Sequence, residues 1–171
     1  MSSLLKVRSE VETDATQVKV LRQILTAGFI DQTAVRLDLA LKKPIKFTSC
    51  RNVPYRSSSN VSEEVFIHPS SALFHRPPPD FIVFQEVVRT SRPWLKGVTR
   101  INPAWLVELG KGMCSFSRPE EVTTKGGSKV KEVREGEREV VVVPHFRGLE
   151  VNLPAVRMKQ RREGTRWVLV E

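Results

Sequence analysis

A cluster of cationic and hydroxyl side chains between residues 89 and 100 has the chemistry to bind phosphate groups. Arginine and lysine neutralise phosphate oxygens, and serine and threonine hydroxyls donate hydrogen bonds to them. Arg89, and Lys96 with Arg100, fall at even spacings within apolar runs, so each set is expected to share one face of a strand. The predicted phosphate-binding residues are Arg89, Thr90, Ser91, Arg92, Lys96 and Arg100, with Arg51 and Arg56 as second-tier candidates.

The same charges also suit a solvent-exposed hairpin whose only role is solubility, and the residues alone leave both interpretations open. The placement of charge favours an anionic partner. Residues 40–118 carry twelve Lys or Arg against five Asp or Glu, whereas residues 1–39 sum to zero. The excess positive charge therefore lies on the strand-rich centre, where nucleic-acid contact is expected. Trp94, in the same turn, either stacks on a base or packs on the domain.

Motifs for catalysis and metal binding are missing from the sequence. It has no GxxxxGK[ST] phosphate loop, no GxGxxG after a strand, no GxSxG elbow and no HExxH. The histidines and cysteines lack the spacing of metal ligands: His68, His75, His145, Cys50 and Cys114. No base is predicted beside Ser70, and His68 is expected to bond nearby backbone at the end of a strand. The sequence therefore predicts no catalytic residue, metal ligand or cofactor in this chain. No apolar run approaches the about 20 residues that cross a bilayer, so no membrane partner is expected.

Three apolar runs, rich in Val, Ile and Phe and separated by Pro, Ser and Gly, hold the predicted phosphate-binding residues in place. They predict strands at Val65–His68, Phe81–Thr90 and Leu95–Ile101. A short helix follows, in which Asn102 can cap the first turn and Gly110 can take the left-handed exit conformation. Small strands that lead into a short helix predict a compact barrel rather than a parallel α/β sheet.

The flanking segments predict two helices and two late strands. Asp14 and Gln17 have capping-box spacing at the start of a helix over Asp14–Ala27, and a second helical segment is expected at about 31–41. Further strands are expected at Asn52–Arg56, Val140–Val143 and Trp167–Val170. Residues 1–44 are therefore interpreted as a helical segment and connector, 45–118 as the barrel, 119–139 as a flexible loop, and 140–171 as a β extension packed on the barrel.

The central stretch also resembles the DEAH-box RNA helicases. Ile67–Phe74 reads IHPSSALF, and Phe81–Arg92 and Val98–Leu106 are similar to the strand and helix-entry motifs that follow in the C-terminal domain of that family. Upstream, Ala27–Phe29 and Val35–Arg36 resemble the end of the preceding helical domain. The resemblance covers about residues 18–116. It implies an OB-fold: a mainly β domain with flanking helices, built as an antiparallel barrel with an N-terminal helical segment and a C-terminal β extension.

Within the family, the resemblance is strongest to the nucleolar member that acts in small-ribosomal-subunit assembly. It implies a non-catalytic part of an ATP-dependent helicase in the nucleus and nucleolus, which helps to clamp single-stranded RNA, pre-ribosomal or small nucleolar. The implied partners are RNA, the parent helicase core and ribosome assembly factors. The motor domains are absent from this sequence, so ATP, Mg²⁺ and ATP hydrolysis belong to the inferred parent chain.

A rival hypothesis is a protein-docking module that contacts no RNA. In that interpretation an exposed edge at Val140–Val143 and the C-terminal tail bind an assembly factor or the motor of the parent protein. The basic group Arg157, Lys159, Arg161 and Arg162 suits an RNA contact, a protein contact or a solvated strand end.

Overall fold

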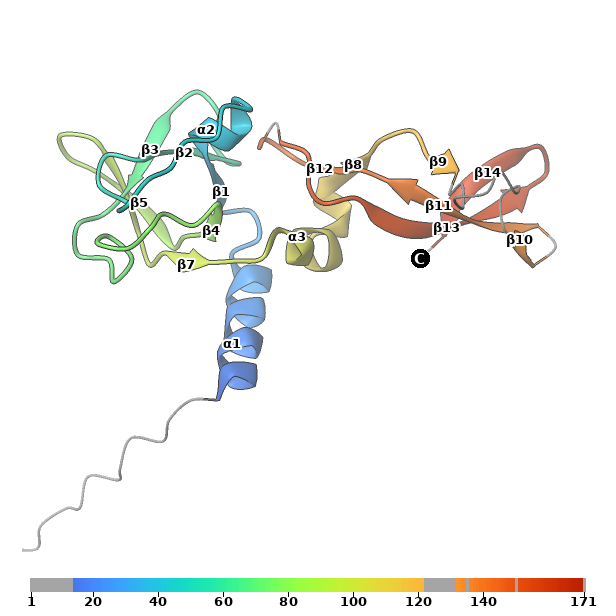
Figure 1. The fold of residues 1–171 in the computed structure, drawn as a ribbon, viewed down its shortest axis with the longest axis horizontal. Helices are drawn as coiled ribbons and strands as arrows, with labels where there is room; N and C mark the ends of the chain where they lie inside the picture. The colour runs from blue at the N-terminus through green and yellow to red at the C-terminus, as the bar shows by residue number, and fades with distance from the viewer. Residues whose placement is uncertain (1–13, 122–131, 135, 150, 171) are drawn as a thin grey trace, which may run out of the picture.

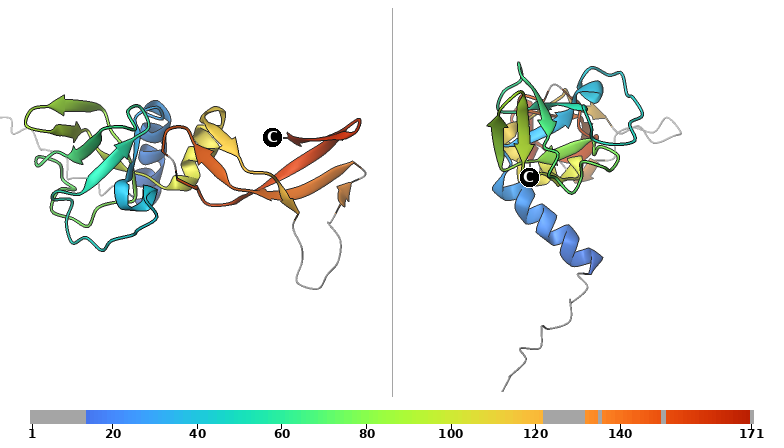
Figure 2. Two further views of the ribbon diagram at one scale, coloured as in Figure 1. Left: turned by 90° about the horizontal axis from the view of Figure 1, so that it is seen from above. Right: turned by 90° about the vertical axis from the view of Figure 1, so that its left-hand side faces the viewer.

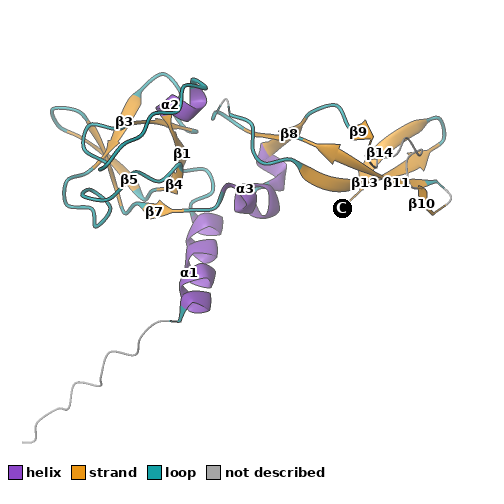
Figure 3. Ribbon diagram, viewed as in Figure 1, coloured by secondary structure: helices purple, strands orange, loops and turns teal. Residues whose placement is uncertain are grey.

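The computed structural model describes residues 14–121, 132–134, 136–149 and 151–170. The molecule is elongated, with a β-barrel at one end, a twisted C-terminal sheet at the other, and a short helix between them (Figure 1). A longer helix projects away from the barrel, as the right-hand view of Figure 2 shows. Strands and loops dominate the picture coloured by secondary structure (Figure 3), which confirms the predicted mainly β class with flanking helices.

The projecting helix is α1 (Ala15–Gly28), close to the prediction of Asp14–Ala27. Its N-terminus has the predicted capping box, in which the Gln17 side chain accepts a hydrogen bond from the Asp14 N–H at 3.1 Å. One end of α1 lies against β7 and α3. Much of its apolar surface faces solvent, including Leu21 at 54% and Ile24 at 61% exposure. No helix among the described residues is long and apolar enough to span a membrane.

Seven strands form the barrel sheet in the order β5-β6-β3-β2-β1-β4-β7. Their bounds are β1 (Thr33–Arg36), β2 (Pro54–Ser57), β3 (Glu64–Ile67), β4 (Phe81–Val83), β5 (Glu86–Arg89), β6 (Pro93–Lys96) and β7 (Thr99–Arg100). All neighbouring strands run antiparallel except β3 and β6, which pair in parallel through Phe66 with Trp94 and Ile67 with Leu95. The predicted antiparallel barrel therefore contains one parallel pair.

One chain segment closes the sheet into a barrel, because β4 and β5 are separated only by Phe84 and Gln85. The Phe84 N–H donates to the Gln32 carbonyl at 3.0 Å, extending the ladder between β4 and β1. The Gln85 N–H donates to the Lys96 carbonyl at 3.0 Å, extending the ladder between β5 and β6. The segment therefore bonds β1 on one side and β6 on the other.

The predicted helical segment at 31–41 is wrong over its first half. Residues 33–36 form β1, which pairs with both β2 and β4, and only Leu37–Ala40 form the short helix α2. Thr33, Ala34 and Val35 are buried, with Ala34 and Val35 in apolar clusters, and pairing with β2 and β4 overrides the local helical pattern. The barrel therefore begins at Thr33 rather than residue 45, and the strand predicted at Asn52–Arg56 is its second, β2.

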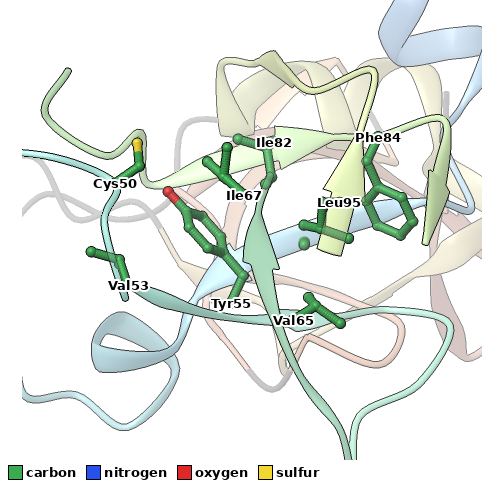
Figure 4. Close-up of a cluster of buried hydrophobic side chains, with 9 residues drawn as sticks. Cys50, Val53, Tyr55, Val65, Ile67, Ile82, Phe84 and Leu95 are labelled. Carbon is green, nitrogen blue, oxygen red and sulfur yellow. The ribbon is translucent and has the colours of Figure 1, made fainter. Parts of the chain in front are cut away.

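The barrel interior is filled by apolar side chains from β1, β2, β3, β4 and β6 and from the loop before β2 (Figure 4). Tyr55, Ile67 and Leu95 are fully buried there. The Tyr55 hydroxyl donates to the Pro79 carbonyl at 2.8 Å, so its polar atom is satisfied within the core. The cluster consists of Ala34, Cys50, Val53, Tyr55, Val65, Ile67, Ile82, Phe84 and Leu95.

A second apolar cluster lies where helix α3 (Pro103–Leu109) meets the barrel. The Asn102 side chain accepts from the Ala104 N–H at 3.0 Å, which confirms the predicted cap. Gly110 does not take the left-handed conformation, because its φ is −120°. A side chain at this position would be too close to its neighbours instead, since a Cβ would lie 2.9 Å from Ile30 Cγ1. The cluster consists of Val35, Phe81, Val83, Ile101, Trp105, Leu106, Phe146, Leu149 and Leu153.

The C-terminal part forms two smaller sheets. A 3-10 turn (Lys111–Met113) leads to β8 (Cys114–Phe116), which pairs with β12 (Pro144–Phe146). The C-terminal sheet has the order β10-β11-β13-β14, and β9 also pairs with β11. Its bounds are β9 (Glu120–Glu121), β10 (Glu132–Arg134), β11 (Glu137–Val142), β13 (Val156–Glu163) and β14 (Arg166–Val170). Phe146, Leu149 and Leu153 pack in the second barrel cluster.

Two predictions for this part need correction. Residues 140–143 do not form a free edge, because β11 lies between β13 on one side and β9 and β10 on the other. Among the described residues, the free apolar edge belongs to β14, which pairs only with β13. The flexible loop predicted at 119–139 lies largely outside the described residues, at 122–131 and 135. In the described remainder, β9, β10 and the start of β11 are strands.

Candidate nucleic-acid interface

The predicted phosphate-binding residues Arg89, Thr90, Ser91 and Arg92 lie at the tip of the hairpin between β5 and β6. The Thr90 N–H donates to the Arg92 carbonyl at 3.3 Å and closes the turn. Both hydroxyl residues of the tip are exposed. These four consecutive residues therefore lie together at the surface of the hairpin tip.

Arg89 is held by an acidic neighbour from the loop before β3. Its Nη2 atom lies 2.7 Å from Glu63 Oε2, and its side chain is 60% exposed. The hydrogen bond and the charge of Glu63 raise the pKa of Arg89. An exposed pair of this kind is screened by solvent, so Arg89 can exchange Glu63 for a phosphate at little cost.

Three groups contact the guanidinium of Arg92 at the tip. Its Cζ atom lies 4.5 Å from the centroid of the Phe66 ring and 5.5 Å from that of Trp94. Its Nη1 atom donates to Asn52 Oδ1 at 3.1 Å. A guanidinium has five N–H donors, so Arg92 keeps donors for a phosphate while stacked on the rings.

The two rings under Arg92 belong to an apolar row on the outer face of the barrel. Phe66 is paired with Pro54 of β2 and with Trp94 of β6, and Trp94 is paired with Val88 of β5. Phe66 and Trp94 meet edge to face, with centroids 6.3 Å apart and an interplanar angle of 67°. We call these side chains with Arg92 the stacking platform: Pro54, Phe66, Val88, Arg92 and Trp94.

Two further predicted cations, Lys96 and Arg100, lie apart. Lys96 lies on β6 and lines a pocket with His68, Ser70 and Gln85, among other residues. Arg100 lies on β7 and lines other pockets, beside α1. The prediction that both share a face fails because Gly97, at φ +62°, turns the chain between them.

The second-tier candidates flank the stacking platform. Arg51 is exposed and lines a pocket of about 540 Å³ that Trp94, Asn52, Phe74 and other residues also line. Arg56 is half-buried on β2, where its register partner on β3 is Glu64. The residues around this pocket lie on the loop before β2 and on the turn after β3, so the stacking platform continues into a concave surface.

The sequence interpretation missed Phe66, Pro54 and Asn52. Phe66 had only a partial signal: strand alternation places it opposite Val65 and Ile67, but three consecutive apolar residues do not tell which side faces the core. Pro54 and Asn52 had none, because the contact of Asn52 with Arg92 joins residues forty positions apart. For Trp94 the sequence left open packing on the domain or stacking on a base. Its ring packs on Phe66 and stays half-exposed beside the pocket, so the structure is compatible with both.

The described residues carry no metal site, because no group of three or more His, Cys, Asp or Glu side chains is arranged to hold an ion. Contrary to the prediction, Ser70 has a base beside it, since its Oγ lies 2.7 Å from His68 Nδ1. The Ser70 N–H also donates to Nδ1 at 3.1 Å, so the ring closes the turn after β3 much as expected for His68. Burial raises the pKa of the Cys50 thiol to about 11, which leaves it unreactive.

The stacking platform lies on the part of the barrel that OB-fold proteins use for oligonucleotides, namely the face of their second and third strands with the adjoining loops. A family model described as the oligonucleotide/oligosaccharide-binding (OB)-fold matches residues 21–113, which include the whole barrel. The chain belongs to this OB-fold family. The expected OB-fold is therefore confirmed both by the family match and by the barrel topology.

Two relatives of this OB-fold chain are RNA helicases. The probable ATP-dependent RNA helicase DHX37 of Homo sapiens is 37% identical over 106 residues, which are 62% of this chain and 9% of that protein. ATP-dependent RNA helicase DEAH13 of Arabidopsis thaliana is 31% identical over 101 residues, 59% of this chain and 7% of that protein. The matched part of the chain thus spans less than a tenth of either helicase. These matches confirm the predicted resemblance to the C-terminal OB-fold region of DEAH-box RNA helicases.

Proposed function

We propose that the chain is the non-catalytic C-terminal part of an ATP-dependent DEAH-box RNA helicase and that its OB-fold clamps single-stranded RNA. The observation that carries the proposal is Arg92, stacked on Phe66 and Trp94 with N–H donors beyond the one that Asn52 accepts. OB-folds bind single strands by stacking bases on aromatic rings and by pairing phosphates with cations. The stacking platform supplies both within one surface.

We also propose where this clamp acts and on which RNA. The RNA is pre-ribosomal or small nucleolar RNA, and the site of action is the nucleolus during maturation of the small ribosomal subunit. ATP and Mg²⁺ bind the parent motor, whose core and assembly factors are the protein partners. The sequence motifs shared with the nucleolar family member support this setting, and the helicase relatives support the parent.

Binding of a labelled single-stranded oligouridine of about 12 nucleotides, followed by fluorescence anisotropy, tests the clamp. Trp94→Ala is expected to cost about 1–3 kcal/mol of binding free energy, which is the range for one stacked base. Trp94→Phe keeps a ring and is expected to restore most of the affinity.

Trp167→Ala is the matched control for that experiment. Trp167 also lies under a guanidinium, since Arg138 Cζ is 4.3 Å from its centroid, but it belongs to the C-terminal sheet. Equal losses for Trp94→Ala and Trp167→Ala, or no loss for either, would remove the stacking platform from RNA binding.

A second candidate function, docking of a protein, is favoured by the edge of β14. Among the described residues this strand pairs only with β13, and Val168 is 42% exposed on it. A free strand edge can accept an extended peptide as an additional strand. A Val168→Pro variant removes the N–H in the middle of β14. If it abolishes capture of an assembly factor by the intact helicase and leaves oligouridine affinity unchanged, docking is the function of this edge.

A further inference from the structure

Two adjoining pockets form a groove where α1 meets the barrel. One, of about 630 Å³, lies between α1 and the start of α3. The other, of about 400 Å³, lies beside the prolines at 77–79. Arg22, Pro79, Asp80 and Arg100 line both, so the two are one continuous depression, which we call the α1 groove. Figure 1 shows α1 beside β7 and α3 at this position.

The α1 groove is strongly cationic. Its charged lining consists of Lys19, Arg22, Arg76, Arg100 and Asp80. The one carboxylate of this lining is already engaged, because Asp80 Oδ1 lies 3.0 Å from Nη1 of Arg36, outside the groove. The four cations therefore line the α1 groove with little local compensation, and their summed field favours an anion.

None of these four cationic side chains forms a hydrogen bond or ion pair with another side chain in the described part of the molecule. Several arginines elsewhere do find carboxylate partners: Arg36 binds Asp38, Arg89 binds Glu63, and Arg161 binds Glu137. Arg22 is half-buried, so its guanidinium is partly removed from water without a carboxylate in return. An anion in the α1 groove would supply the missing partner.

The segment between β3 and β4 connects the α1 groove to the stacking platform. Phe74 and His75 of this segment line the pocket that Trp94 and Arg51 also line. Arg76, the next residue, lines the α1 groove. A strand that leaves the stacking platform past Phe74 therefore reaches the α1 groove by rounding one short segment.

We propose that the α1 groove binds backbone phosphates of the same single-stranded RNA that occupies the stacking platform. Lys19 and Arg22 come from α1, Arg76 from the β3–β4 segment, and Arg100 from β7, so the charges are spread along the groove rather than focused on one point. A spread of this kind fits successive phosphodiesters better than a single phosphate group. The proposal rests on the RNA clamp and adds Lys19, Arg22 and Arg76 to it.

The test measures the salt dependence of oligouridine binding by the full chain. In the variant Arg22→Gln/Arg100→Gln, the slope of log K against log[NaCl] is expected to fall by about 1.4, or about 0.7 for each phosphate that the variant no longer neutralises. The control Arg161→Gln/Arg166→Gln removes the same charge from β13 and β14 and is expected to leave the slope unchanged.

A second variant protects the test against misfolding. Lys19 and Arg76 are exposed, so Lys19→Gln/Arg76→Gln is not expected to change the melting temperature, yet the same reduction in slope is expected. Unchanged slopes in both groove variants overturn the proposal. So do equal reductions in groove and control variants, which indicate a diffuse charge effect. Binding of poly-glutamate is measured in parallel. If the groove variants lose poly-glutamate binding but keep oligouridine binding, the proposal is also overturned and the groove is assigned to an acidic protein.

Failure of the groove and failure of the clamp give different results. Trp94→Ala is expected to lower affinity without changing the salt slope, because it removes a ring and no charge. If Trp94→Ala weakens binding and the groove variants keep the wild-type slope, the clamp stands and the groove proposal fails. If the groove variants reduce the slope and Trp94→Ala has no effect, the stacking platform fails and the groove alone holds the strand.

Discussion

The barrel and the C-terminal sheet are both built mainly of antiparallel strands, but only the barrel encloses a core. The β4–β5 segment closes the barrel, and nine side chains fill its interior. In the C-terminal sheet, the buried described side chains are Val140, Val142 and Gln160, and β14 keeps a free edge. The closed region can hold the stacking platform rigidly, whereas the open region retains backbone groups for pairing with another chain.

The largest expected effect is on the free energy of unfolding, when one aromatic side chain is truncated in each region. Phe84→Ala empties a site that is 2% exposed in the barrel and is expected to cost about 3–5 kcal/mol of unfolding free energy. Trp167→Ala removes a half-exposed ring from β14 and is expected to cost much less. Urea denaturation of both variants checks this. Similar losses would contradict the difference in packing between the regions.

A somewhat smaller effect locates the boundary between the regions. Leu149 follows β12 in the chain, yet it is fully buried in the cluster that also contains Val35 and Trp105. Leu149→Ala is therefore expected to destabilise the barrel by about 2–5 kcal/mol, as measured by thermal unfolding. Leu109→Ala, at a position 41% exposed, is the control. If Leu149→Ala leaves the unfolding of the barrel unchanged, β12 and the turn after it do not belong to the barrel.

The acid response should also differ between the regions. Burial alone would raise the pKa of Asp38, but the hydrogen bonds from Arg36 and the Ile45 N–H and the charge of Arg36 outweigh it and lower the pKa. The resulting stabilisation is present above the ordinary value of 3.8 and is lost as the pH falls through the lower folded value.

Asp38→Asn is expected to remove this acid-dependent loss and to cost about 1.5–3 kcal/mol at pH 7, as measured by urea denaturation from pH 7 to pH 2. Glu137→Gln is the control in the C-terminal sheet, because its pair with Arg161 is exposed to solvent. An equal change in acid sensitivity for both variants would contradict the assignment to Asp38.

The smallest effect is expected at the exposed ion pairs, where the regions should behave alike. Arg89→Ala breaks the pair with Glu63 on the barrel, and Arg161→Ala breaks the pair with Glu137 on the C-terminal sheet. Solvent screens both pairs, so neither variant is expected to shift the melting temperature measurably. A clear shift of the melting temperature in only one variant would show that its ion pair contributes to stability.

Much of the fold was readable because local chemistry and tertiary structure agree. The runs around Val65 and Phe81 become strands, and Asn102 caps α3. The helical prediction for residues 33–36 is wrong, because nothing local reveals that β2 and β4 will cover both edges of this strand. At the candidate interface, residue type and hairpin position indicate Arg89 and Arg92. The ring pair under Arg92 requires the register of β3 against β6, which no local pattern contains.

The three prolines at 77–79 have a consequence for how the barrel tolerates change. Two of their carbonyls accept side-chain hydrogen bonds: Arg36 Nη1 donates to Pro78 at 3.1 Å, and the Tyr55 hydroxyl donates to Pro79 at 2.8 Å. A proline has no backbone N–H, so none of these three residues needs a hydrogen-bond acceptor in the interior. Replacing the buried Pro78 with alanine would deprive the protein of no existing hydrogen bond and would still introduce an amide proton that needs an acceptor. Any loss of stability from this substitution would therefore come from the added amide proton and not from a lost hydrogen bond.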